Sequence, residues 1–205
     1  MESRVRPGDI PLRGEAMPEP VRAFVAIRLA PEVDAAIARF QAELRPLGAD
    51  ISWPVPANFH LTLRFLGNRV APGVIENVIF RLRPIAAATA AMMVRARGAG
   101  AFPSLNRPRV IWVGLADEAL AQAAAKVEAV CVRCGLEPEK RGFAPHLTIG
   151  RVRNPSRDAQ MREAIEAAAE RDFGGSTVAS MTVYRSRLSP RGATYEVLAT
   201  LPLEG

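Results

Sequence analysis

The sequence predicts an α+β fold of two similar lobes, each a mostly antiparallel sheet with helices packed outside, and a cleft between them. The only two histidines, His60 and His146, open the same pattern, His-Leu-Thr followed by an aliphatic residue. The same offset of 86 residues (146 minus 60) carries the apolar run at 24–27 onto the run at 110–113. In both copies a helical pattern, the histidine motif, a second helix and another strand follow. This repetition predicts one duplicated unit, with copies at about 22–100 and 108–188.

The first twenty residues are rich in proline, glycine and charged residues, so we expect a poorly ordered tail. Residues 21–205 are then expected to form a single bilobal domain. Met17 is a second possible start of translation. We find no secretory signal and no uninterrupted apolar stretch of the ~18 residues that a membrane helix needs. The sequence therefore predicts a soluble, cytoplasmic protein.

In the first copy, hydrophobic periodicity and breaker residues place the elements in order. A short apolar strand is followed by a helix that Pro31 opens and Gly48 ends, with one apolar stripe along it. The stretch Trp53-Pro54-Val55-Pro56 is extended and leads into the first histidine strand, which Gly67 and Asn68 close. The predicted elements are strand 22–29, helix 31–47, strand 59–66, helix 72–83 and strand 91–97.

The second copy begins after a breaker-rich segment, 98–108, which predicts a loop. Asp117 is the expected N-cap of a helix that ends at Gly135, and Ser156 is the expected cap of a helix that reaches about residue 171. The turn residues at 189–192 predict a hairpin. The predicted strands are 110–115, 146–152, one near 177–187 and 193–201.

Both histidine motifs read as strands in which apolar and polar residues alternate. Strict alternation puts His60, Thr62 and Arg64 on one face and the leucines on the other, and it pairs His146 with Thr148. A lone His-x-Thr is usually only a half-buried strand. With threonine at roughly one residue in twenty, a chance match at both histidines is about a one-in-400 event. We therefore take His60, Thr62, His146 and Thr148 as candidate site residues.

The net charge is +6, and Lys126 and Lys140 are the only lysines. Arginine guanidinium groups match phosphate oxygens well, so the charge suggests an anionic partner. A biased amino-acid composition explains the same excess equally well.

Cys131 and Cys134 form a C-x-x-C, a spacing that also occurs in redox and zinc sites. Here the two cysteines continue the apolar stripe of a helix, at its C-terminal end, whereas an activated redox cysteine favours a helix N-terminus. A zinc site would need further ligands. We expect the two cysteines to pack in the core.

Two imidazoles suit a reaction in which one group attacks as another leaves. In displacement at phosphorus, a neutral imidazole deprotonates the nucleophile and an imidazolium protonates the departing oxygen. The neighbouring threonine hydroxyls then bind the non-bridging phosphoryl oxygens. The sequence has neither a carboxylate cluster nor a glycine-rich phosphate loop, so we expect no metal and no other cofactor.

The paired motifs, together with Arg22-Ala23-Phe24-Val25-Ala26-Ile27 and Pro108-Arg109-Val110-Ile111-Trp112, resemble the 2H phosphoesterase superfamily. Within it the chain looks most like the bacterial RNA 2′,3′-cyclic phosphodiesterases, also called 2′-5′ RNA ligases. The resemblance covers residues 22 to about 203 and implies metal-free hydrolysis of a 2′,3′-cyclic phosphate at an RNA end to a 2′-phosphate. It implies that His60 is the proton donor and His146 the proton acceptor, and that Thr62 and Thr148 hold the phosphate.

Three further residues are candidates for substrate contacts. Where relatives read His-Leu-Thr-Leu-Ala-Arg, this chain has Gly150 before Arg151, and strict alternation turns Arg151 away from the cleft unless Gly150 permits a bulge. Arg64 is therefore the preferred phosphate ligand, with Arg151 kept as a candidate. Phe102, in the predicted loop, is a candidate for stacking on a base, although a small core contact is the commoner role of such an aromatic residue.

Two alternative functions remain open. The same site would serve another cyclic or 2′-5′ nucleotide, such as an ADP-ribose cyclic phosphate, or would act in the reverse direction as a 2′-5′ RNA ligase. A non-catalytic nucleotide- or RNA-binding module is the alternative from another class. The expected partners are RNA ends or nucleoside 2′,3′-cyclic phosphates, without a membrane. The sequence does not give the oligomeric state, for which a monomer is the default expectation.

Overall fold

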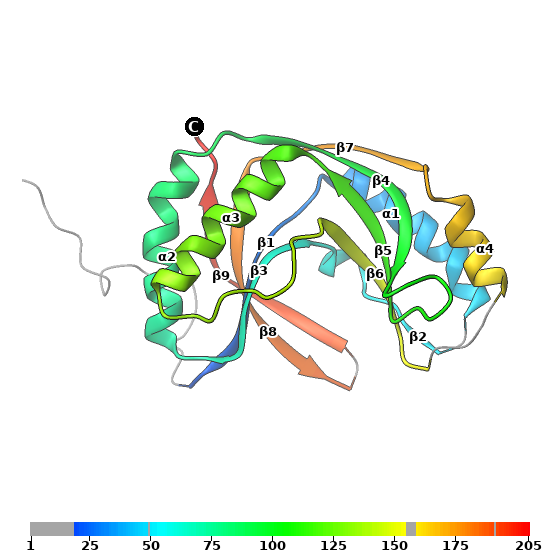
Figure 1. Ribbon diagram of the computed structural model, residues 1–205, viewed down its shortest axis with the longest axis horizontal. Helices are drawn as coiled ribbons and strands as arrows, with labels where there is room; N and C mark the ends of the chain where they lie inside the picture. Colours follow the sequence, from blue (N-terminus) through cyan, green and yellow to red (C-terminus); the bar gives the residue numbers. More distant parts are fainter. Residues whose placement is uncertain (1–18, 49, 155–158, 191) are drawn as a thin grey trace, which may run out of the picture.

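The computed structural model describes residues 19–48, 50–154, 159–190 and 192–205. Over these residues the chain forms one nine-stranded sheet in which all neighbouring strands are antiparallel. Its order is β7-β4-β5-β6-β3-β1-β8-β9, and the short β2 pairs with β6. Figure 1 shows this curved sheet with helices along its outer side. The predicted α+β class is confirmed.

The strands are β1 Val21–Ile27, β2 Ile51–Ser52, β3 Leu61–Val70, β4 Met92–Phe102, β5 Val110–Ala116, β6 His146–Val152, β7 Asp172–Val178, β8 Ser180–Ser189 and β9 Gly192–Pro202. The helices are α1 Pro31–Leu44, α2 Pro72–Ala87, α3 Glu118–Arg133 and α4 Ala159–Ala167. Two 3-10 turns, η2 Arg45–Leu47 and η3 Pro56–Asn58, complete the elements.

The two histidine strands meet at the centre of the sheet. β3 and β6 pair at a single position, Leu61 with Leu147, and these two residues are themselves 86 apart (147 minus 61). To one side of this pair lie β6, β5, β4 and β7, and to the other lie β3, β1, β8 and β9. The Leu61–Leu147 pair therefore lies at the junction of the two halves of the sheet, each of which contains one histidine strand.

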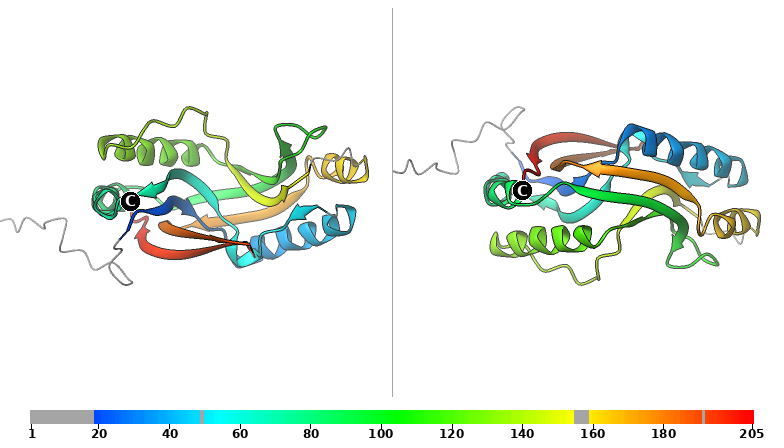
Figure 2. Two further views of the ribbon diagram at one scale, coloured as in Figure 1. Left: turned by 90° about the horizontal axis from the view of Figure 1, so that it is seen from below. Right: turned by 90° about the horizontal axis from the view of Figure 1, so that it is seen from above.

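Each half of the sheet takes strands from both ends of the chain. β4 precedes residue 108 in sequence but pairs with β5 and β7, while the late strands β8 and β9 extend the half that contains β1. Each half also receives helices from both parts of the chain. α1 and α4 pack on the β7-β4-β5-β6 half, and α2 and α3 pack mainly on the other half. Figure 2 shows α3 and α1 on opposite sides with the strands between them. The proposed limits of the duplication, 22–100 and 108–188, stay a prediction.

Strict alternation along the histidine strands is wrong, because each strand contains a bulge. The β1–β3 register shifts between Thr62 and Arg64, and the β5–β6 register shifts between Thr148 and Gly150. The extra residues are Leu63 and Ile149, again 86 apart (149 minus 63). A bulge sends the following side chains to the opposite faces from those that alternation predicts.

Two predicted strand ends are also wrong. β3 does not stop at Gly67 but continues to Val70, since Gly67 adopts a φ of 149° at a register shift and the pairing with β1 resumes. β4 continues through Gly98–Phe102, where the sequence predicts a loop. In this stretch Gly98 has a φ of 74° where the β4–β5 register shifts. The Trp112 ring packs directly against the Gly100 backbone, in the space that a Cβ would occupy. These glycines allow irregular pairing and close packing instead of ending the strand.

Strand β7 is separate from β8, whereas the sequence predicts a single strand near 177–187. The segment Asp172–Val178 contains Gly174 and Gly175, which weaken its strand pattern, and it pairs only with β4 at one edge of the sheet. Helix α4 ends at Ala167, earlier than predicted, and the predicted cap Ser156 and the tail to residue 18 lie outside the described residues.

Other local predictions are confirmed. Asp117 caps α3, since its carboxylate accepts a hydrogen bond of 2.8 Å from the Ala119 amide. Pro31 opens α1. Cys131 is fully buried in the core, and burial raises the pKa of its thiol to about 12, so it is an inert packing residue. Cys134, at the C-cap of α3, is only partly buried and packs against the core. No helix in the described part of the chain is both long and apolar enough to cross a membrane.

Candidate active site

The two histidine motifs lie next to each other because β3 and β6 cross at Leu61 and Leu147. Both leucines are fully buried, so the flanking polar residues share the opposite face. Continuing the antiparallel register by one residue sets His60 opposite Thr148 and Thr62 opposite His146. The charge of His146 acts on His60, as expected for two rings that lie near each other. The fold thus gathers the four candidate residues into one group.

Each imidazole is held in the same way. His60 Nδ1 lies 2.7 Å from the carbonyl oxygen of Asn58, and His146 Nδ1 lies 2.7 Å from that of Ala144. A carbonyl oxygen only accepts, so Nδ1 carries the hydrogen and donates it. In each ring Nε2 is therefore the nitrogen that is left to exchange a proton with a substrate.

Aromatic rings surround His60. Its imidazole stacks on Phe24, with centroids 4.8 Å apart, and meets Tyr195 edge-on at 5.1 Å. Phe24 also contacts Tyr184, and Phe65 packs on the same small cluster. Burial lowers the pKa of His60 below its usual value, and the nearby positive charges of Arg151, Arg28 and His146 lower it further, while the Asn58 carbonyl opposes them. His60 is thus neutral more readily than an exposed histidine.

Among the described residues, His146 contacts fewer aromatic rings than His60 does. Its imidazole meets the Phe102 ring edge-on, at 5.0 Å and 85°. Phe102 also lies 5.2 Å from Trp112, on the strand beside His146. The predicted base-stacking residue therefore lies at the site, at the end of β4, and its stacking role stays a prediction.

The structure does not bring Arg64 to the histidines. The bulge at Leu63 turns Arg64 toward α3 and the segment that follows it, where its side chain is nearly buried. Its guanidinium pairs with Glu128, lies 3.5 Å from Glu139 and donates to the carbonyl oxygen of Glu137. A hollow of about 630 Å³ beside these residues contains neither histidine. These contacts commit Arg64 to binding the loop after α3.

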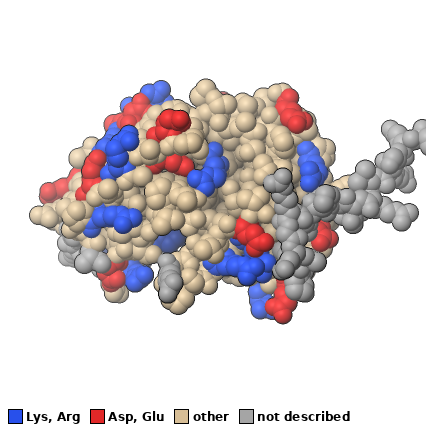
Figure 3. Space-filling view, turned by 180° about the vertical axis from the view of Figure 1, so that it is seen from behind, with Lys and Arg blue, Asp and Glu red and all other residues tan. Residues whose placement is uncertain are grey.

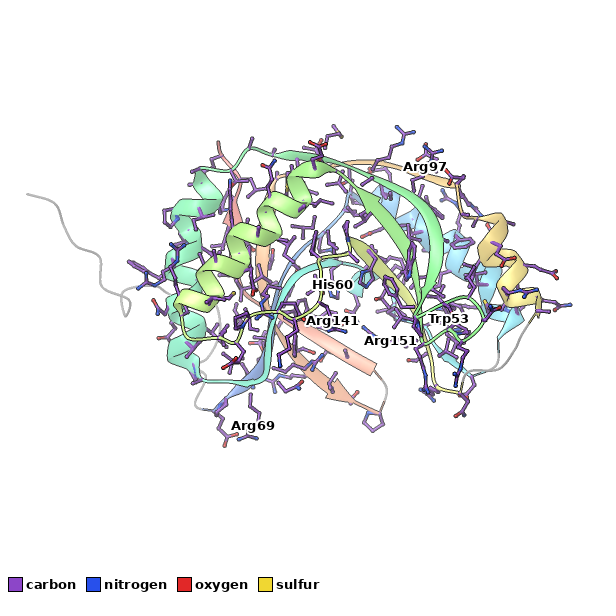
Figure 4. All side chains as sticks on the ribbon, in the orientation of Figure 1. Trp53, His60, Arg69, Arg97, Arg141 and Arg151 are labelled. Carbon is purple, nitrogen blue, oxygen red and sulfur yellow. The ribbon has the colours of Figure 1, made fainter. Side chains whose placement is uncertain are left out.

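The equivalent bulge in β6 does the opposite for Arg151. With Ile149 as the extra residue, Gly150 is buried against Trp53, and Arg151 is exposed. Burial lowers the pKa of His60, and the Arg151 charge lowers it further; burial raises the pKa of Tyr195, and the Arg151 charge opposes that rise. Figure 4 labels His60 and Arg151 in the central part of the molecule. The bulge is present next to Gly150, and of the two candidate arginines Arg151 is the one that lies near His60.

The remaining charge is mixed. On the face seen in Figure 3, basic and acidic side chains alternate over the described surface without a continuous basic patch. Several arginines are paired with carboxylates, such as Arg171 with Glu43 at 2.6 Å. The net charge of +6 therefore does not by itself mark a nucleic-acid surface on this face.

Sequence reasoning missed four residues around His60: Phe24, Arg28, Asn58 and Tyr195. In the sequence Phe24 looks only like part of an apolar strand, and Asn58 precedes His60 by two positions without forming a motif. Tyr195 lies 135 positions beyond His60 (195 minus 60). Only the pairing of β1, β3, β8 and β9 brings these residues together, and no local pattern signals it.

Comparison with known proteins agrees with this geometry. Residues 27–112 and 113–195 match the family described as LigT like Phosphoesterase, one match for each histidine motif. An RNA 2′,3′-cyclic phosphodiesterase of Methanothermobacter thermautotrophicus is 31% identical over 176 residues, which cover 85% of this chain and 95% of the relative.

Solved structures are similar over most of their length. A Thermus thermophilus protein has a TM-score of 0.77 at 28% identity and covers 90% of this chain and 98% of its own. Escherichia coli LigT complexed with 3′-AMP has a TM-score of 0.73 at 26% identity, over 91% of this chain and 100% of its own. With the doubled His-x-Thr motif at the junction of the two halves, these matches show that the chain belongs to the LigT-like family of 2H phosphoesterases.

Proposed function

We propose that this chain is an RNA 2′,3′-cyclic phosphodiesterase that hydrolyses a terminal 2′,3′-cyclic phosphate to a 2′-phosphate. The observation that carries the proposal is the pair of equivalently anchored imidazoles on either side of the Leu61–Leu147 contact. Relatives with that name share about 30% of their residues with the chain.

In the proposed reaction, His146 Nε2 takes a proton from water as its oxygen attacks phosphorus. The bond from phosphorus to the ribose 3′ oxygen breaks, and that oxygen takes a proton from His60 Nε2. Thr62, Thr148 and Arg151 hold the non-bridging oxygens, where charge builds up in the transition state. The products are a 2′-phosphate and a free 3′ hydroxyl, and the two imidazoles have exchanged protonation states.

The donor role requires His60 to carry a proton when the substrate is bound. In the free protein burial lowers the pKa of His60, which favours the neutral ring. The cyclic phosphate carries one negative charge, and an anion beside an imidazole raises its pKa. The substrate thus supplies the charge that stabilises the imidazolium. Turnover should follow a bell-shaped pH profile, because one ring must be neutral and the other charged.

Metal independence is part of the proposal. Among the described residues no three His, Cys, Asp or Glu side chains are grouped so as to hold a metal ion. The expectation itself stays a prediction, as does the cytoplasmic location.

The test is hydrolysis of a nucleoside 2′,3′-cyclic phosphate in excess EDTA, with separation of the 2′- and 3′-monophosphates. We expect the 2′-product, and a loss of roughly 10²–10⁴-fold in kcat for His60→Ala and for His146→Ala. The melting temperature of each variant checks that it folds. Activity within tenfold of wild type in either variant, or activity that EDTA abolishes, would contradict the proposal.

The alternative functions separate in the same assay format. 2′-5′ oligonucleotides and ADP-ribose cyclic phosphate test other substrates, and RNA with a 2′,3′-cyclic end plus a 5′-hydroxyl acceptor tests ligation. Binding of 3′-AMP, the ligand in the Escherichia coli LigT structure, without any turnover would favour the binding module.

A further inference from the structure

The two anchoring carbonyls come from different residue types. Asn58 and Ala144 occupy equivalent positions, each two residues before its histidine and 86 apart (144 minus 58). The Ala144 side chain is a methyl group. The Asn58 side chain instead donates a hydrogen bond of 2.8 Å from Nδ2 to the carbonyl oxygen of Ala193, at the start of β9. Only the His60 anchor is tied by its own side chain to another strand.

The strand that Asn58 contacts, β9, also contacts His60 directly. Ala193 and Tyr195 lie two residues apart on β9, and Tyr195 meets the His60 ring edge-on at 5.1 Å and 86°. Tyr195 also meets Phe24 edge-on at 5.0 Å, beneath the imidazole. His60 therefore contacts both Asn58 and Tyr195, and these two residues are linked to each other through Ala193. An imidazole that is held at Nδ1, on one face and at its edge has little freedom to rotate.

Tyr195 lies on β9, which is paired with β8 on both sides of this residue. β9 is the edge strand of the sheet and pairs only with β8. The β8–β9 register shifts between Val183 and Tyr184, close to the cluster. The hairpin is joined to β3 through β1, and the hydrogen bond from η3 to β9 adds a direct link between the hairpin and the segment that leads into His60.

The charged and titratable groups that face His60 come from each element packed against it. They are Arg28 beyond β1, Arg151 and His146 on β6 and Tyr195 on β9. Burial raises the pKa of the Tyr195 hydroxyl, so Tyr195 stays neutral and holds His60 by its ring. The surroundings of His60 and His146 are thus unequal, although the motifs are alike.

We propose that Asn58 and Tyr195 are positioning residues that hold the β8–β9 hairpin against His60. This contact makes the surroundings of the His60 ring differ from those of the His146 ring. The proposal rests on the proposed function for its effect on turnover. Its structural part is tested independently of turnover.

The first experiment follows the imidazoles by NMR. The chain has two histidines, so a long-range proton–nitrogen spectrum of the untagged protein shows two ring systems, which His60→Ala assigns. In Asn58→Ala, which copies the residue at Ala144, we expect the His60 signals to shift and broaden, and the pKa of His60 to rise toward its ordinary value as water enters. The His146 signals should stay in place. Unchanged His60 signals would overturn the proposal.

The second experiment measures kinetics. Asn58→Ala and Tyr195→Ala should each lower kcat roughly tenfold with KM within about twofold of wild type, since the ring is misplaced while phosphate binding persists. Tyr195→Phe, which keeps the ring edge, should recover most of the loss. Ser189→Ala is the matched control: it removes a 2.9 Å hydrogen bond to Gly192 at the tip of the same hairpin and should leave both constants unchanged.

Three outcomes are separable. If wild type shows no hydrolysis but Asn58→Ala still alters the His60 signals, the proposed function fails and the positioning role stands. If kcat for Asn58→Ala and Tyr195→Ala stays within twofold of wild type, the positioning role fails. An equal loss in Ser189→Ala would assign the effect to general loosening of the hairpin and would also overturn the proposal.

Discussion

Single residues decide which of the two candidate arginines lies near the histidines. Arg151 is exposed beside His60, whereas Arg64 is buried among Glu128, Glu139 and backbone carbonyls. We predict that Arg151→Ala lowers kcat/KM roughly 10- to 100-fold, as loss of a charged hydrogen bond does, and leaves stability within about 0.5 kcal/mol. Arg64→Ala should instead lower the free energy of unfolding by about 2–4 kcal/mol, since it leaves Glu128 unpaired.

Urea unfolding and steady-state kinetics of the two arginine variants provide the measurement. Each variant serves as the other's control. If Arg64→Ala reduced activity at full stability, or Arg151→Ala reduced stability at full activity, the assignment of their roles would be reversed.

His60 should also make stability depend on pH. Its pKa is lowered in the folded protein, mainly by burial, and is about 6.5 in an unfolded chain. The unfolded chain therefore binds a proton that the folded protein does not, so stability falls as pH drops from about 6.5 toward the lowered folded value. Urea unfolding at pH 7.5 and pH 5 should show a smaller loss in His60→Gln than in wild type. Equal losses would count against the burial of this ring.

Among individual residues, the sequence identifies four candidate site residues, His60, Thr62, His146 and Thr148, because each His-x-Thr motif is contained within three residues. It does not predict which way Arg64 and Arg151 point, since a bulge depends on the partner strand. It also misses Tyr195, whose contact with His60 depends on the pairing of β1 with both β3 and β8.

Among the elements, β4 and β5 depend on a close approach that only glycine allows. A Cβ at Gly100 would overlap the Trp112 ring, so we predict that Gly100→Ala lowers the free energy of unfolding by about 1–3 kcal/mol. Gly73 in α2 has nothing within 4 Å of its Cβ position, and Gly73→Ala should stabilise by roughly 0.5 kcal/mol. Thermal unfolding checks both, and a neutral Gly100→Ala would show that the ring moves aside freely.

The same glycines explain which elements the sequence predicts poorly. Helices α1 and α3 are marked by Pro31, by the Asp117 cap and by apolar stripes, all of which are local. Gly98 and Gly100 in β4, and Gly174 and Gly175 in β7, resemble breakers in the sequence. They lie within strands because pairing across the sheet overrides their weak strand preference.

For the whole molecule, the exchange of strands between halves predicts that neither repeat folds alone. A fragment of residues 19–107 contains β4 without its partners β5 and β7, and β1 without β8. We expect this fragment to lack a cooperative thermal transition and to gain one when mixed with the fragment 108–205. Cooperative unfolding of either fragment by itself would contradict the crossed arrangement.

The proposed mechanism requires both imidazoles to act on one phosphorus atom. A crystal structure of the protein with a nucleoside 2′-monophosphate, the proposed product, would test this requirement. We expect Nε2 of His60 and Nε2 of His146 to lie within hydrogen-bond distance of the same phosphate group, with Thr62 and Thr148 on its remaining oxygens. A phosphate bound by only one histidine, or bound elsewhere, would rule the mechanism out.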